Sequence, residues 1–113
     1  MSDIQVSQIG SQATIILGDK LTVSDVPNLK SELKRLIEAG VREMFFDCSQ
    51  LDILDSTGIG CLVAAHNSLA NVFGKLAIIQ VSSDIYELLC SMRLDRRISI
   101  SIHSAEISAN KQG

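Results

Sequence analysis

Hydrophobic and polar positions follow two different periods along this chain, and together they predict strands and helices in turn. Residues 4–9 alternate between apolar and polar side chains, and residues 13–17 form a run rich in β-branched residues. Gly10-Ser11 lies between the two runs and is typical of a hairpin turn. The pattern therefore predicts that the chain opens with two short antiparallel strands.

The next apolar residues recur at helical spacing. Between residues 26 and 37 they fall at i, i+3, i+7, i+10 and i+11, which predicts an amphipathic helix. Ser24 or Asp25 can cap the start of this helix, and Gly40 suits its end. A third strand is expected at about residues 43–47, where the apolar run has strand character.

The second half of the chain repeats this alternation. A second helix is predicted from about residue 57 to 73. The continuous apolar run 76–81 indicates a strand that is covered on both faces. Ser82 or Ser83 can cap a third helix, and the clean alternation of residues 98–102 predicts a final strand that is half exposed.

The predicted element order is ββαβαβαβ. Strands that alternate with single helices favour parallel pairing through right-handed crossovers, with the first strand antiparallel at an edge. We therefore expect a single α/β domain over residues 1–113, with a mixed, mostly parallel sheet and helices packed against it. Its core is expected at about residues 3–103, followed by a polar tail at residues 104–113.

The charged and aromatic residues exclude one large class of function. The chain has a net charge of −3 and few aromatic rings, so it offers little on which nucleic-acid bases could stack. The basic cluster of Arg93, Arg96 and Arg97 is too small for a nucleic-acid footprint, and we interpret it as a solvated face. The sequence thus predicts protein partners and no nucleic acid.

The cysteines and apolar runs indicate the compartment. Cys48, Cys61 and Cys90 are odd in number and widely separated, which is typical of reduced thiols. Their spacing does not suit a metal site, so none is predicted. The N-terminus lacks a signal-peptide core, and no apolar run approaches the roughly 20 residues that span a bilayer. We expect a soluble cytoplasmic protein without a membrane segment.

The most informative segment is Asp55-Ser56-Thr57-Gly58-Ile59-Gly60, where a strand gives way to a helix. Ser56 falls in the first helical turn, whose backbone N–H groups have no partner within the helix. Its hydroxyl can therefore cap the helix, or it can carry a phosphate that the helix N-terminus stabilises. Leu51, Ile53, Leu54 and Ile59 surround the serine and either anchor the loop in the core or form a docking surface.

Catalysis is not predicted at this segment. A serine nucleophile needs a nearby base, and His66 lies ten residues along the same helix, about 15 Å away. His103 follows the last strand, and nothing in the sequence fixes its position. Gly58 and Gly60 are not followed by the lysine of a phosphate-binding loop. We therefore expect neither an enzyme nor a nucleotide or other cofactor site.

These residues resemble a known family. Phe46-Asp47, then Leu51-Asp52, then the stretch from Leu54 to Gly60, are similar to the signature of the STAS domain. More narrowly, they resemble the bacterial anti-sigma factor antagonists, and the resemblance covers nearly the whole chain. It implies a small α/β superhelical sheet, which agrees with the order predicted above.

The resemblance also implies a function. In that family, the serine after the motif's aspartate is phosphorylated by a partner that is both anti-sigma factor and serine kinase, and a phosphatase resets the state. Carried over, the acceptor is Ser56, with Thr57 as a weaker second candidate. The protein would be a monomer or weak homodimer that binds the kinase until it is phosphorylated. The implied partner-binding residues are Asp19, Leu21, Leu54, Asp55, Ser56, Thr57, Gly58, Ile59 and Gly60.

One segment departs from the family pattern, and one alternative stays open. Many members carry Gly-Glu-Leu-Asp after the second strand, whereas this chain has Gly18-Asp19-Lys20-Leu21-Thr22, with a basic residue within the acidic pattern. The alternative role is that of a scaffold or accessory subunit of a transport or signalling complex. In that role Ser56 would be a structural helix cap.

Overall fold

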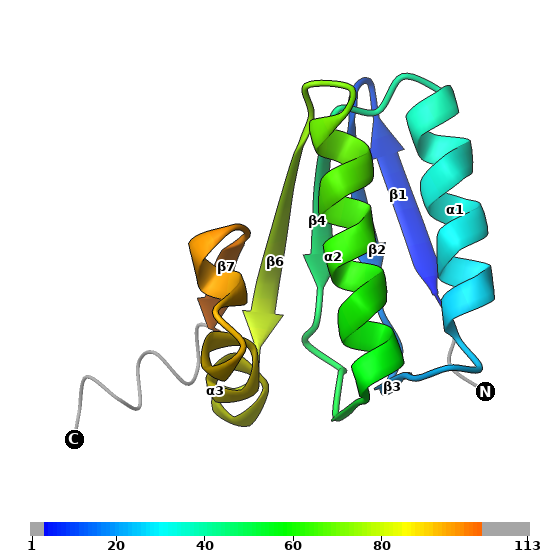
Figure 1. Cartoon of the computed structure of the whole chain (residues 1–113). Helices are drawn as coiled ribbons and strands as arrows, with labels where there is room; N and C mark the ends of the chain where they lie inside the picture. Colours follow the sequence, from blue (N-terminus) through cyan, green and yellow to red (C-terminus); the bar gives the residue numbers. More distant parts are fainter. Residues whose placement is uncertain (1–3, 103–113) are drawn as a thin grey trace.

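Five strands form the central sheet in the spatial order β1-β2-β4-β6-β7 (Figure 1). A computed structural model describes residues 4–102 of the chain. β1 pairs antiparallel with β2, and the other neighbouring pairs in this sheet are parallel, as the sequence predicted. The strands are β1 (Gln5–Ile9), β2 (Gln12–Ile16), β4 (Glu43–Asp47), β6 (Lys75–Val81) and β7 (Ser99–Ile102).

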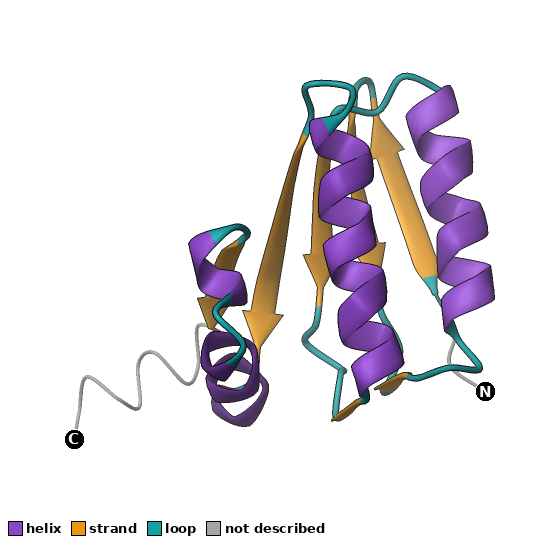
Figure 2. Cartoon of the chain, viewed as in Figure 1, coloured by secondary structure: helices purple, strands orange, loops and turns teal. Residues whose placement is uncertain are grey.

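Two long helices cover one face of this sheet. Figure 2 shows α1 (Val26–Glu38) and α2 (Ser56–Ala70) side by side in front of the strands. The shorter α3 (Ser83–Ser91) lies beside the ends of β6 and β7, and a 3-10 turn, η1 (Leu94–Arg96), leads into β7. The predicted α/β class is confirmed, and so is the predicted order of the three α-helices and the five strands of this sheet. Within residues 4–102, no helix is long and apolar enough to cross a membrane.

The core lies between the helices and the sheet. Ile15, Phe46 and Ile78 stand next to one another on three neighbouring strands, and all three are fully buried. Leu29 of α1 and Leu62 of α2 are also fully buried and belong to the same cluster. Burying such aliphatic and aromatic side chains is the main favourable contribution to folding.

The strand β6 is covered less completely than the sequence suggested. Its residues Leu76 and Ile78 are buried, but Ala77 and Ile79, which point to the other face, are only half-buried. The prediction of full burial on both faces is therefore wrong, because α1 and α2 lie on the same face of the sheet. The end of β6 also contains a bulge, and Gln80 takes a left-handed φ of 63° there.

The helix ends follow the predicted residues in part. The prediction that the second helix reaches residue 73 is wrong, because α2 ends at Ala70 and Phe73 is 97% exposed with a left-handed φ of 62°. Ser82 caps α3, since its hydroxyl accepts a hydrogen bond from the Ile85 N–H at 3.2 Å. Gly40 has a φ of +98°, a conformation that glycine adopts without strain. Asp25 precedes α1, but its side chain does not cap the helix. Its carboxylate instead accepts hydrogen bonds from the N–H and the hydroxyl of Thr22, both at 3.0 Å.

A second, two-stranded sheet was not predicted. It consists of β3 (Lys20–Leu21) and β5 (Ile53–Leu54), which pair in parallel, and it lies near the start of α2 (Figure 1). Two residues are too short to show a hydrophobic period, so only tertiary pairing reveals these strands. Two predicted features, the polar tail at residues 104–113 and His103, lie outside the described residues.

The three thiols are free, and two of them belong to the core. Burial raises the pKa of Cys48 to about 12, and the charge of Asp47 adds to this rise. Burial also raises the pKa of Cys61, against the opposing charge of Lys30. Cys90 is only half-buried. Because the thiolate is the reactive form, the two core cysteines are protected from modification.

This difference predicts the order of alkylation in the native protein. At mildly alkaline pH, iodoacetamide should modify Cys90 first, because Cys48 remains protonated until the pH nears 12. Mass spectrometry of peptides from a time course measures this order, and the same reaction in urea is the control in which the order should disappear. Native Cys48 reacting as fast as Cys90 would contradict the assignment of Cys48 to a closed core.

Candidate functional site

The candidate site lies at the edge of the sheet where the parallel strands end. Figure 1 shows α2 beginning at this edge, beside the small sheet of β3 and β5. The loop from β4 reaches α2 through Leu51, which is 5% exposed and anchors the loop in the core. Asp52 and Ile53 then pair with the Asp19 carbonyl, through N–H···O bonds of 2.8 and 3.0 Å. In open α/β sheets, this edge is where function is usually placed.

Asp55 holds the start of α2. One of its carboxylate oxygens accepts a hydrogen bond from the Gly58 N–H at 2.8 Å, which is the geometry of a helix N-cap. The other accepts from the Val23 N–H at 3.3 Å, and the backbone N–H of Asp55 donates to the Leu21 carbonyl at 3.4 Å. A single residue thus joins the segment after β3 to the first turn of α2.

Ser56 is not the helix cap, which corrects one of the two roles that the sequence allowed. It is already the first residue of α2, whereas Asp55 has the extended backbone (φ −100°, ψ 178°) that a capping residue needs. The side chain of Ser56 is exposed, and within residues 4–102 its hydroxyl makes no hydrogen bond. The neighbouring Thr57 is also exposed. The hydroxyl of Ser56 is therefore accessible at the positive end of a helix.

The two glycines of the first turns have different roles. Gly58 is buried, and a Cβ there would overlap the carbonyl oxygen of Leu21 and lie 2.9 Å from Cδ1 of Leu54. Gly60 is exposed, and a Cβ there would meet nothing within 4 Å. Gly58 therefore permits the close approach of α2 to β3, whereas Gly60 leaves a bare patch of helix surface.

The structure brings the nine predicted partner-binding residues to one edge, but it gives them different positions. Leu21, Gly58 and Ile59 are buried and can only support the surface from behind. Leu54 and Asp55 are half-buried, whereas four members are exposed: Asp19, Ser56, Thr57 and Gly60.

Two exposed apolar side chains complete this edge. Val23 is 63% exposed and follows β3, and Ile53 of β5 is 47% exposed. Sequence reasoning missed Val23, although a valine within the polar turn 22–25 was an available signal. We call the exposed residues Asp19, Val23, Ile53, Ser56, Thr57 and Gly60 the Ser56 surface.

The described residues around Ser56 do not assemble a catalytic or metal-binding set. His66 lies in α2, ten residues beyond Ser56, which places it about 15 Å along the helix axis. Over residues 4–102, no group of three His, Cys, Asp or Glu side chains could hold a metal ion. Arg93, Arg96 and Arg97 are exposed on and around η1, away from α2 in Figure 1.

Comparison with known proteins agrees with this architecture. A family model of the STAS domain matches residues 3–108. The chain belongs to the STAS domain family. No curated protein matches its sequence.

Several solved structures share the fold of this STAS domain at low sequence identity. An anti-sigma factor antagonist from Mycobacterium paratuberculosis aligns over 89% of this chain and 86% of its own, with a TM-score of 0.78 and 14% identity. The phosphorylated form of the Bacillus cell fate determinant SpoIIAA aligns over 95% and 98%, with a TM-score of 0.72 and 16% identity. A STAS protein from Planctomyces limnophilus, described as an anti-sigma-factor antagonist, aligns over 96% of this chain and 98% of its own, with a TM-score of 0.75 and 19% identity.

The two glycines give a matched test of the packing of this STAS domain. Gly58→Ala should lower the free energy of unfolding by about 1–3 kcal/mol, because its methyl group would overlap the Leu21 carbonyl. Gly60→Ala should leave stability unchanged or raise it by up to about 1 kcal/mol through helix propensity. Urea denaturation measures both, and equal effects at the two positions would contradict the close approach at Gly58.

A second pair separates the cap from the exposed serine. Asp55→Ala should cost about 0.5–2 kcal/mol, because the Gly58 and Val23 N–H groups lose their acceptor. Ser56→Ala should change stability by less than about 0.5 kcal/mol. Thermal and urea unfolding of both variants provide the measurement, and a larger loss for Ser56→Ala would show that the serine has a structural role.

Proposed function

We propose that this STAS domain is an anti-sigma factor antagonist that binds its partner through the Ser56 surface and releases it when Ser56 is phosphorylated. The observation that carries the proposal is the Ser56 hydroxyl, which is exposed at the start of α2 and makes no hydrogen bond within the described part of the chain. Asp55 already caps the helix, so a structural need for a hydroxyl at Ser56 does not account for the serine.

The start of α2 suits a phosphate. The first-turn N–H groups and the helix dipole favour negative charge, and a phosphoserine adds about −1.5 to −2 charges at neutral pH. Because Ser56 is exposed, the group can be added without displacing core residues. The phosphorylated domain is therefore expected to keep its fold.

The same phosphate would weaken a complex formed over this surface. Val23 and Ile53 are exposed apolar side chains: the Val23 N–H bonds the Asp55 carboxylate, and Ile53 lies three residues before Ser56. In the proposed complex the partner covers both side chains together with Ser56. A covered phosphate must lose its water, which is costly for a charged group without a matched partner. The exposed carboxylates of Asp19 and Asp52 add negative charge at the same edge. A penalty of about 1.4 kcal/mol would already reduce affinity tenfold.

The proposed partner is an anti-sigma factor that also acts as the serine kinase for Ser56, with Thr57 as a second acceptor. Unphosphorylated antagonist would occupy the anti-sigma factor and free the sigma factor for transcription. A serine phosphatase would restore the binding form. In this cycle the STAS domain acts in the cytoplasm as a non-enzymatic switch, as a monomer or weak homodimer, and it needs no cofactor of its own.

Mass analysis of the native protein tests the modification. The chain should be isolated from its own cells under growth and under stress, and its intact mass and peptide map should be recorded. We expect a phosphate on Ser56 whose occupancy differs between the two conditions. Absence of phosphate under every condition would contradict the switch and favour a constitutive scaffold or accessory subunit.

A pair of charge substitutions tests the effect on binding. Ser56→Asp should weaken the complex with the cognate anti-sigma factor by at least about tenfold, because a carboxylate replaces a neutral group at the interface. Ser31→Asp is the matched control, since it adds the same charge at an exposed serine of α1. Isothermal titration calorimetry gives both affinities, and equal affinities for the two variants would argue against an interface at Ser56.

A further inference from the structure

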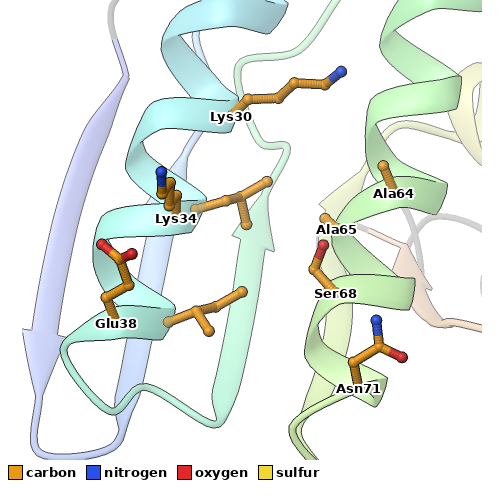
Figure 3. Close-up of a pocket in the computed structure, with 9 residues that line it drawn as sticks. Lys30, Lys34, Glu38, Ala64, Ala65, Ser68 and Asn71 are labelled. Atoms are coloured by element: carbon orange, nitrogen blue, oxygen red, sulfur yellow. The ribbon is translucent and has the colours of Figure 1, made fainter.

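A groove lies between α1 and α2. Its volume is about 590 Å³, and Figure 3 shows the two helices forming its walls. Leu33 and Ala65 are buried and form an apolar floor together with the half-buried Ile37. We call this hollow the α1–α2 groove.

The two walls of the groove differ in their chemistry. On α2 the wall consists of short side chains, including the exposed Ala64 and Ser68, which leave space above the floor. On α1 the wall carries Lys30 and Lys34, and Figure 3 shows Lys30 reaching from α1 toward α2. Neither lysine forms an ion pair within residues 4–102. In a chain of net charge −3, the groove therefore offers a local pair of positive charges.

The charge of Lys30 acts across the groove. It opposes the rise that burial causes in the pKa of the Cys61 thiol on α2. Glu38 lies near the opposite end of the groove and is the single acidic residue among those that line it. The positive potential is therefore concentrated over the half that contains Lys30 and Lys34.

We propose that the α1–α2 groove binds an acidic amphipathic helix of a protein partner. From Lys30 to Glu38 the α1 wall spans nine residues, or about 12 Å along the helix axis, which matches about two turns of a docked helix. The short side chains of α2 allow a docked helix to pack against α2 at the usual distance between helix axes, about 8–10 Å. Leucines of the docked helix would lie on the apolar floor, and its carboxylates would face the two lysines. This inference does not rest on the proposed function.

A helix is favoured over a small anion because the groove is open. Six of its nine lining residues are exposed, so the floor is not closed over from above. A small molecule would leave much of its own surface in water, whereas small-molecule sites usually enclose most of their ligand. A helix covers the whole length of the floor and places several carboxylates beside the lysines at once.

The test uses the isolated STAS domain and a synthetic peptide of about 16 residues, long enough to form helix in solution. The peptide carries leucines at i, i+3, i+4 and i+7 and glutamates beside them, and the comparison peptide replaces each glutamate with lysine. NMR titration of the labelled domain should show saturable shifts for Leu33, Ala64 and Ser68 with the acidic peptide. The affinity should fall as salt is added.

Two pairs of variants locate the binding. Lys30→Glu combined with Lys34→Glu should lower the affinity for the acidic peptide by at least about tenfold. Lys75→Glu, at an exposed lysine of β6, should leave that affinity unchanged. Ala64→Leu should fill the groove and weaken binding as well, whereas Ala70→Leu should not, because Ala70 is exposed on α2 but does not line the groove. Unchanged amide spectra confirm that each variant is folded.

Three outcomes would overturn the proposal. The first is the absence of saturable shifts at millimolar acidic peptide, and the second is equal binding of the lysine peptide. The third is saturation of the groove by the carboxylate amphiphile decanoate without binding of the peptide, which would assign the groove to a small anion.

Discussion

The close approach of Gly58 to the carbonyl oxygen of Leu21 is the constraint on which this edge of the molecule depends. It sets the first turn of α2 directly against β3, at a separation that a side chain on Gly58 would prevent. The pairing of β3 with β5 and the two hydrogen bonds of the Asp55 carboxylate are compatible with this one geometry. Segments that are more than thirty residues apart in sequence thereby form one continuous surface.

This arrangement assigns structure and chemistry to different residues. Asp55 is half-buried and satisfies backbone N–H groups of two segments, so it contributes to the fold. Ser56 is exposed and makes no such contact within the described range, so its hydroxyl can change chemically without loss of a structural bond. Adjacent residues in one motif can therefore be under separate constraints, one from stability and the other from recognition.

The sequence predicted the long elements because each repeats its apolar pattern several times. The helix at 26–38, the strand at 43–47 and the antiparallel first strand all follow from such patterns. The small sheet, the identity of the cap and the exposure of Val23 could not be predicted, because each depends on which distant segment lies nearby. The resemblance to STAS domains located Ser56, but the separate roles of Gly58 and Gly60 emerge only from the backbone beside them.

The composite nature of the Ser56 surface has a consequence for what a partner can recognise. Val23 belongs to a different segment from Ser56 and is brought to the start of α2 only when β3 and β5 are paired, whereas Ile53 lies three residues before Ser56 in the chain. A short linear peptide that contains Ser56 lacks the two members of this surface, Asp19 and Val23, that come from the other segment. A partner that contacts both segments therefore distinguishes folded copies from nascent or damaged chains. The amount of correctly folded domain, rather than the total amount of polypeptide, would then set the strength of the signal.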